Sequence, residues 1–131
     1  MIKEVFEYFV AQAESKLSVN CVKGFPDWAR PAVVTPCAAL ELAAWSPGIP
    51  RRIGQNQARQ SVTLRLWLFA RHEPELAQML DSLATWAEDG EAPVVGSSRL
   101  TVNWLEGQRH FSETGSQAEA HGFTVPLSVT W

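Results

Sequence analysis

Residues 59–71 contain the longest regular alternation in this chain, and it constrains the fold more than any other feature. One face of the pattern carries Val62, Leu64, Leu66, Leu68 and Ala70, and the other carries Thr63, Arg65, Trp67 and Phe69. A period of two residues is typical of a β-strand that buries one face. About 12 residues at about 3.3 Å each give roughly 40 Å, whereas the usual strand has about 5–6 residues. We therefore expect this strand to project beyond its sheet or to bend.

Two other segments show the helical period. Apolar side chains recur at spacings of three and four in residues 2–17 and again in residues 74–89, which predicts two amphipathic helices. Pro74 suits the first position of the second helix, and Gly90 suits its end. Glu88 and Asp89 come at the C-terminal end of that helix, where the helix dipole disfavours acidic side chains. Such a mismatch indicates a role for these acids outside helix stability.

Shorter apolar runs predict the remaining strands, which we expect near Val19–Val22, over 37–44, over 99–105 and over 123–131. Pro126 lies inside the last run, and because proline has no amide hydrogen to donate, it marks an edge or bulged position. The segments between the strands are rich in Pro, Gly and polar residues. We expect an ordered loop up to residue 36, a long polar loop or hairpin tip over 45–58, and a polar connection over 107–122 with a short strand near His110–Phe111.

The order of these segments is helix, strands, long hairpin, helix and strands. It predicts one α+β domain over residues 1–131, with a mostly antiparallel β-sheet, two helices packed on one face and a long projecting β-hairpin. The inward faces of these elements define the expected core, which consists of Leu66, Leu68, Leu80, Leu83, Val102 and Val125 packed against Phe6 and Phe9.

Composition excludes several classes of protein. The chain has 131 residues, of which 46% are hydrophobic and 19% charged, which is ordinary for a globular domain. The net charge of −3 does not support nucleic-acid binding as the main activity, because phosphate contacts need a basic surface. No apolar run approaches the roughly 20 residues that span a bilayer. The start at Met1-Ile2-Lys3-Glu4-Val5 lacks the pattern of a signal peptide, so we expect a protein made in the cytosol.

The residues that most often carry chemistry form no recognisable site. Cys21 and Cys37 are expected to be free buried thiols, with a disulfide between them as the alternative. His72, His110 and His121 are not at metal-ligand spacing from one another or from a cysteine, and we expect them to be structural or surface residues. No nucleophile, phosphate-loop or dinucleotide motif is present in the sequence. We therefore expect no catalytic residue, no metal, no cofactor and no enzyme activity.

Charge is segregated along the chain. Residues 51–72 hold five arginines and no acid, namely Arg51, Arg52, Arg59, Arg65 and Arg71. Residues 73–92 hold six acids and no base, namely Glu73, Glu75, Asp81, Glu88, Asp89 and Glu91. The two blocks pair either within one subunit or between subunits. Complementary patches on one chain allow head-to-tail association, which closes into a ring if the rotation permits.

Tryptophan is abundant, with six residues in the chain. Trp67 and Trp86 fall off the main apolar faces of their segments, which indicates either a second packed layer or an interface, where Trp and Arg are enriched. The candidate interface residues are Trp45, Arg51, Arg52, Arg59, Arg65, Trp67, Phe69, Glu88, Asp89 and Glu91.

The organisation of the whole chain resembles that of phage tail terminator (tail completion) proteins. The segments that carry the resemblance are Ile2–Leu17, Arg59–Arg71 followed by Pro74–Asp89, and the closing Phe123–Trp131. The resemblance lies in the pattern of elements, since no short signature defines that family. It implies an α+β subunit of a homo-hexameric ring that caps the tail tube, stops its polymerisation and provides a docking surface for the head or neck.

The same resemblance implies partners and a location. The partners are further copies of the chain, the tail tube protein and a neck or head-completion protein. DNA would pass through the central pore without sequence-specific binding, and no membrane would be involved. The mature protein would lie in the tail of a virion, after synthesis in the host cytoplasm.

Two other functions stay open from the sequence. One is a small cone-shaped α+β domain, a ligand-binding module or an enzyme, with a pocket between helices and sheet. Its polar groups would come from His72, His110 or His121 together with Glu41 or Glu106. The other is a different oligomeric virion or secretion component, such as a neck or baseplate adaptor.

Overall fold

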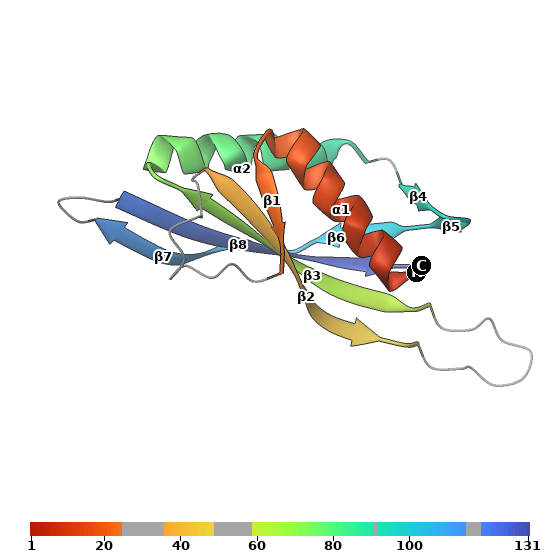
Figure 1. Ribbon diagram of the computed structural model, residues 1–131. Helices are drawn as coiled ribbons and strands as arrows, with labels where there is room; N and C mark the ends of the chain where they lie inside the picture. Colours follow the sequence, from red (N-terminus) through yellow and green to blue (C-terminus); the bar gives the residue numbers. More distant parts are fainter. Residues whose placement is uncertain (25–35, 49–58, 91, 115–118) are drawn as a thin grey trace, which may run out of the picture.

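Two helices lie on one face of a twisted six-stranded sheet (Figure 1). This computed structural model describes residues 1–24, 36–48, 59–90, 92–114 and 119–131. The helices are α1 (Ile2–Leu17) and α2 (Glu73–Glu88). The strands of the main sheet are β1 (Asn20–Lys23), β2 (Cys37–Ser46), β3 (Ser61–Ala70), β6 (Thr101–Trp104), β7 (Gln108–Thr114) and β8 (Glu119–Thr130). A separate pair is formed by β4 (Val94–Val95) and β5 (Ser98–Arg99).

The main sheet has the strand order β1-β2-β3-β8-β6, and β7 also pairs with β8. All of these pairs are antiparallel except β1 with β2, which is parallel. This arrangement confirms the α+β fold with a mostly antiparallel sheet. The two predicted helices and the strands near Val19–Val22 and over 37–44 are confirmed within a few residues at each end.

The helices form where the apolar stripe predicts them. Val5, Phe9 and Ala13 of α1 are buried against the sheet, and so are Leu76 and Leu83 of α2. Apolar residues three and four apart lie on one side of a helix, so each helix can bury a single stripe. The first helix ends at Ser18, whose backbone is left-handed with φ of 54°. Gly90 follows α2 with φ of 62°, a backbone angle that glycine adopts without strain.

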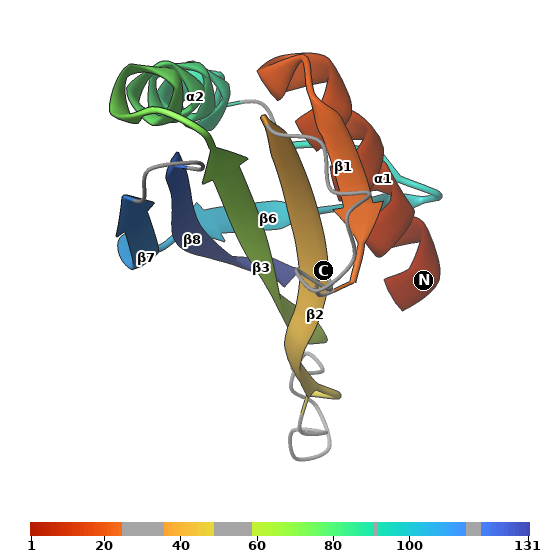
Figure 2. The same cartoon turned by 60° about the vertical axis from the view of Figure 1, so that its left-hand side comes forward.

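The long strand is β3, and it pairs along its whole length with β2 on one side and β8 on the other. Beyond Leu40 the side chains of β2 leave the core and become exposed, from Leu42 to Ser46. Figure 2 shows the outer ends of β2 and β3 running out together, away from α2. Trp45 and Ser46, expected in a loop, belong to β2 because they are in register with Val62 and Ser61. The hairpin tip over 49–58 lies outside the described residues.

The polar segment over 107–122 is the main error of the secondary-structure prediction. It contains the whole of β7, in which the short strand expected near His110–Phe111 lies, and the start of β8, which pairs with β7 as an antiparallel hairpin. β7 and the first residues of β8 are rich in polar residues, so hydrophobic alternation predicted neither the full length of β7 nor the start of β8. Main-chain hydrogen bonds to the neighbouring strand define them instead. The predicted strand over 99–105 is divided between β5 and β6.

Pro126 lies in the interior of β8 and not at an edge of the sheet. It is opposite Arg65 of β3, and its carbonyl accepts a hydrogen bond from the amide of Leu105 at 2.9 Å. Pairing with β6 ends at Leu127, and pairing with β7 begins at Thr124. Three residues, 105–107, therefore lie opposite two residues, 125–126, which is a bulge. The missing amide hydrogen falls at this break, so the bulged alternative for Pro126 is the correct one.

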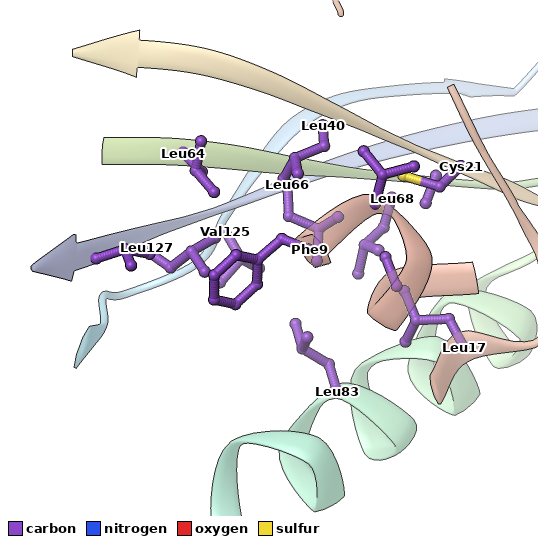
Figure 3. Packing of buried hydrophobic residues seen from close by; sticks show 14 of the residues in the cluster. Phe9, Leu17, Cys21, Leu40, Leu64, Leu66, Leu68, Leu83, Val125 and Leu127 are labelled. Carbon is purple, nitrogen blue, oxygen red and sulfur yellow. The ribbon is translucent and has the colours of Figure 1, made fainter. Parts of the chain in front are cut away.

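The core lies between the helices and the inner face of the sheet (Figure 3). Leu66, Leu68, Leu83 and Val125 are buried there with Phe9, as the sequence predicts. The other expected core residues, Leu80, Val102 and Phe6, are partly buried and pack against this cluster. A second, smaller cluster on the opposite face of the sheet contains Cys37, Ala39, Trp67 and Phe69.

The two cysteines are free and buried, which confirms the expectation for the described chain. Cys21 is opposite Ala38 and belongs to the core under the helices, whereas Cys37 belongs to the cluster on the other face. A disulfide needs Cβ atoms that approach to about 3.5–4.5 Å with vectors that converge. The sheet itself therefore separates these thiols.

We expect Leu66→Ala to lower the free energy of unfolding by about 2–5 kcal/mol, because it leaves a cavity at a fully buried site. Leu80→Ala should cost less than Leu66→Ala, because the partly buried Leu80 leaves a cavity that solvent can enter. Chemical denaturation of the two variants measures both values. A loss below about 1 kcal/mol for Leu66→Ala would mean that the inner face has been assigned wrongly.

Burial raises the pKa of Cys21 to about 12 and the pKa of Cys37 to about 11. Because the thiolate is the reactive form, both cysteines should react with Ellman's reagent at pH 8 only after denaturation. The folded pKa values lie above the reference value of 9.0, so the unfolded chain loses these protons first. The stabilising contribution is complete below pH 9 and is lost as pH rises toward the folded values. Rapid labelling of the native protein by Ellman's reagent at pH 8 would contradict the burial of the two thiols.

Candidate interaction surfaces

The outer end of the β2–β3 hairpin is exposed and carries large apolar side chains. Leu42 is 50% exposed and Trp45 is 55% exposed, although both belong to a strand. The indole Nε1 of Trp45 donates to Oε1 of Gln60 across the hairpin at 3.3 Å. Large exposed apolar side chains that lie close together on a soluble domain are typical of an interaction surface.

Among the basic candidates that the structure describes, Arg59 lies at this end of the hairpin. Arg59 is exposed at the base of β3, and its Nη1 donates to Oγ1 of Thr101 at 3.3 Å. Arg51 and Arg52 lie outside the described residues. The structure therefore places one arginine of the predicted basic patch beside the first residue of β6.

The acidic candidates lie at the C-terminal end of α2, where Glu88 and Asp89 are exposed. Asp89 forms an ion pair with Lys16 of α1, with 3.5 Å between Nζ and Oδ2. This lysine supplies the positive charge that the last turn of α2 lacks. Both side chains are largely solvent-exposed, so the pair contributes little to stability. Glu91 lies outside the described residues.

In the ranges that the structure describes, ion pairs join members of the two charged blocks to residues outside them. Besides Lys16–Asp89, Arg65 pairs with Glu41 at 2.8 Å, and Arg109 pairs with Glu73. Arg65 and Glu41 are directly opposite each other on β3 and β2. Pairing between the blocks themselves stays an untested hypothesis.

Trp67 and Phe69 are buried within the subunit, which corrects the expectation that they form part of an exposed contact surface. They are 4% and 1% exposed, and their rings stack with centroids 6.1 Å apart. The ring of His110 packs edge-on against Trp67 at 4.7 Å. Glu41 Oε1 accepts hydrogen bonds from Trp67 Nε1 at 2.9 Å and from Arg65 at 2.8 Å. These residues therefore form the second packed layer that the sequence left open as the alternative.

The histidines do not converge on a pocket between helices and sheet. His110 and Glu106 line a shallow hollow of about 430 Å³ on the opposite face, together with Arg65. His121 is buried, and its Nδ1 accepts from Arg109 at 3.2 Å, because a guanidinium only donates. His72 precedes the first turn of α2.

A groove of about 540 Å³ does open between the helices and the sheet, beside β6. Its walls include Tyr8 of α1, Trp86 of α2 and Trp104 of β6, and the rings of Trp86 and Trp104 meet edge-on at 4.9 Å. Lys16 and Asp89 lie at the same groove. The displacement of Trp86 from its helical stripe was the sequence signal for this site. Trp104 gave no such signal, because its alternation places it on the core face of its strand.

Two further observations concern metal binding and membrane crossing by the described part of the chain. In the ranges that the structure describes, no three His, Cys, Asp or Glu side chains are grouped so that they could hold a metal ion. The helices described above are also too short or too polar to cross a membrane.

Comparisons with known proteins give a similarity of fold. No family model matches the sequence, and no curated protein matches it. Among solved structures, the chain is similar to a chain of the virion of a native gene transfer agent particle. The TM-score is 0.52 with 11% sequence identity, and the match covers 92% of this chain and 84% of the other. At this level of identity the shared property is the fold.

Proposed function

We propose that this chain is a structural protein of a virion, and that its role is that of a tail terminator subunit. The observation that carries the proposal is the fold shared with a virion chain over nearly the whole length of this chain. The exposed outer end of the β2–β3 hairpin and the segregated charges also favour self-association over turnover. The protein works by shape and assembly and performs no reaction.

In the proposed role, copies of the chain associate head to tail into a homo-hexameric ring on the end of the tail tube. The ring stops polymerisation of the tube protein, offers a docking surface to a neck or head-completion protein, and leaves a pore for DNA. Association of this kind uses two different patches on each subunit, so in a closed ring every patch is in contact with a neighbouring subunit. The protein is made in the host cytoplasm and resides in the tail.

We expect tails assembled without this protein to be abnormally long, because nothing stops the tube from growing. Electron microscopy of tails assembled with and without the protein measures this directly. Tails of normal length and structure in its absence would contradict the proposed function.

Deletion of residues 48–57 should leave the domain folded but abolish ring formation or tube capping. Loop tips tolerate deletion when their backbone is not part of the core, and the flanking strands β2 and β3 remain paired with each other, with β3 also paired to β8. The unfolding transition of the variant tests the fold, and light scattering with tail-length measurement tests assembly. Tails of normal length with the deleted variant would show that the hairpin tip has no part in capping.

Replacing Arg51 and Arg52 by Glu should weaken ring formation and reduce its salt dependence. We propose that the basic patch of Arg51, Arg52 and Arg59 lies against the acidic patch of Glu88, Asp89 and Glu91 on a neighbouring copy. Exposed ion pairs contribute about 0–1 kcal/mol each, so apolar burial must supply most of the affinity.

The matched control for this charge reversal is Lys3→Glu with Arg71→Glu, which changes the net charge by the same amount at two exposed sites. Assembly is measured by light scattering at low and high salt. Equal assembly of the two double variants at both salt concentrations would rule out the pairing of these patches.

A further inference from the structure

The two ends of the sheet differ in which strands form their edges. We call the end that contains Cys21 the inner end and the end that contains Ser46 the outer end. At the inner end the pairings connect Cys21, Ala38, Leu68, Phe123 and Arg109, so the row runs β1-β2-β3-β8-β7. At the outer end the pairings connect Ser46, Ser61, Thr130 and Thr101, so the row runs β2-β3-β8-β6. The outer part of β2 and the whole of β6 therefore lie at the same level, on opposite edges (Figure 1).

Both outer edges are free in the part of the chain that the structure describes. Pairing of β1 with β2 ends at Leu40, and from there to Ser46 the pairings of β2 are with β3. The pairing of β6 is with β8. Unpaired main-chain groups at a strand edge recruit another strand. The inner edge at β1 is different, because the amide of Cys21 donates to Oε1 of Glu14 at 3.4 Å.

The directions of the strands suit a continued sheet. Each step from β2 to β3, to β8 and to β6 is antiparallel, so β2 and β6 of one subunit run in opposite directions. A second copy related by rotation about an axis along the strands presents its β2 antiparallel to β6 of the first. The helices of both copies then lie on the same side of the joined sheet.

Both edges carry large apolar side chains on the helix side of the sheet. Trp45 is opposite Val62, a core residue, so its exposed ring lies on the helix side of the sheet. Val102 and Trp104 of β6 also pack against the core, and both line the groove beside β6. When the rows of paired residues continue without a shift from one copy into the next, Ser46 of one copy faces Thr101 of the next. Trp45 then faces Val102. Its ring would then enter the groove that Trp86 and Trp104 leave open.

We propose that residues 42–46 of β2 in one copy of this chain pair as an antiparallel strand with Thr101–Trp104 of β6 in the next copy. Trp45 is the side chain that fills the groove beside β6. The inference rests on the proposed function, because it names the contact that joins neighbours in the proposed ring. The inner end of the sheet has one strand more than the outer end, which keeps the copies apart there and makes the assembly curve.

Cysteine pairs test this register. Ser46→Cys with Thr101→Cys, and Ala44→Cys with Asn103→Cys, place exposed thiols on residues that face each other across the proposed contact. Within one chain two strands separate each pair, so the distance is about 14 Å at about 4.8 Å per strand, beyond the limit for a disulfide. Every disulfide between these residues therefore joins two copies. The native cysteines are buried and do not interfere.

We expect mild oxidation to convert both double variants into a ladder of covalent oligomers, in purified protein at high concentration and in assembled tails. Peptide mapping should identify the 46–101 and 44–103 bonds. The matched control, Ser46→Cys with Gln78→Cys, pairs two exposed sites outside the contact and should give about tenfold less product. Adding Trp45→Ser to the first pair should lower its yield by about tenfold or more, because buried tryptophans dominate interfaces.

Cross-linking at or below the control level, in both samples, would overturn the edge pairing. The proposed function fails by a different result, which is normal tail length without the protein. Cross-linked oligomers together with normal tails would retain the edge pairing and reject the terminator role. Long tails without the protein, together with no cross-link, would retain the role and reject this contact.

Discussion

The rest of the structure depends on the pairing of β3 between β2 and β8. Its inner face carries Leu64, Leu66 and Leu68, each at most 1% exposed, and both helices bury their apolar stripes against that side of the sheet. Ten residues of unbroken register with β8 hold this face in position. Because β2 accompanies β3 past the helices, the same pairing also carries Leu42 and Trp45 into solvent. One strand thus provides the centre of the core and the support of the projecting hairpin.

Sequence reasoning succeeded where hydrophobic periodicity was strong and failed where hydrogen bonding alone defines a strand. The stripes of α1 and α2 and the alternation of β3 predicted their elements within a few residues. β7 and the first residues of β8 are polar, so this part of the hairpin carried no periodic signal. Trp67 illustrates the limit for sites, because an aromatic side chain opposite the leucines suits an interface or a second layer equally well. Its contacts with Glu41, Phe69 and His110 decide for the layer.

The candidate surfaces combine weak and strong contributions to association. Charge pairs between exposed side chains, such as those of Arg59 or Glu88, steer and orient partners but add little affinity. The apolar contribution has to come from the exposed Trp45 and from the groove beside β6, where Trp86 and Trp104 are only partly buried. These features lie at opposite edges of one sheet, which is the arrangement that head-to-tail association requires.

The position of the outer part of β2 and of β6 on opposite edges of the sheet determines how many neighbours each copy binds through the proposed contact. In that contact each subunit uses one edge at β2 and one edge at β6, so its valence is two. Units of valence two form chains or closed cycles but do not branch into networks. An open chain always has one bond fewer than it has subunits, whereas a cycle has as many bonds as subunits. Closure thus gains a contact without recruiting another copy, and partial rings become rare intermediates in a cooperative assembly.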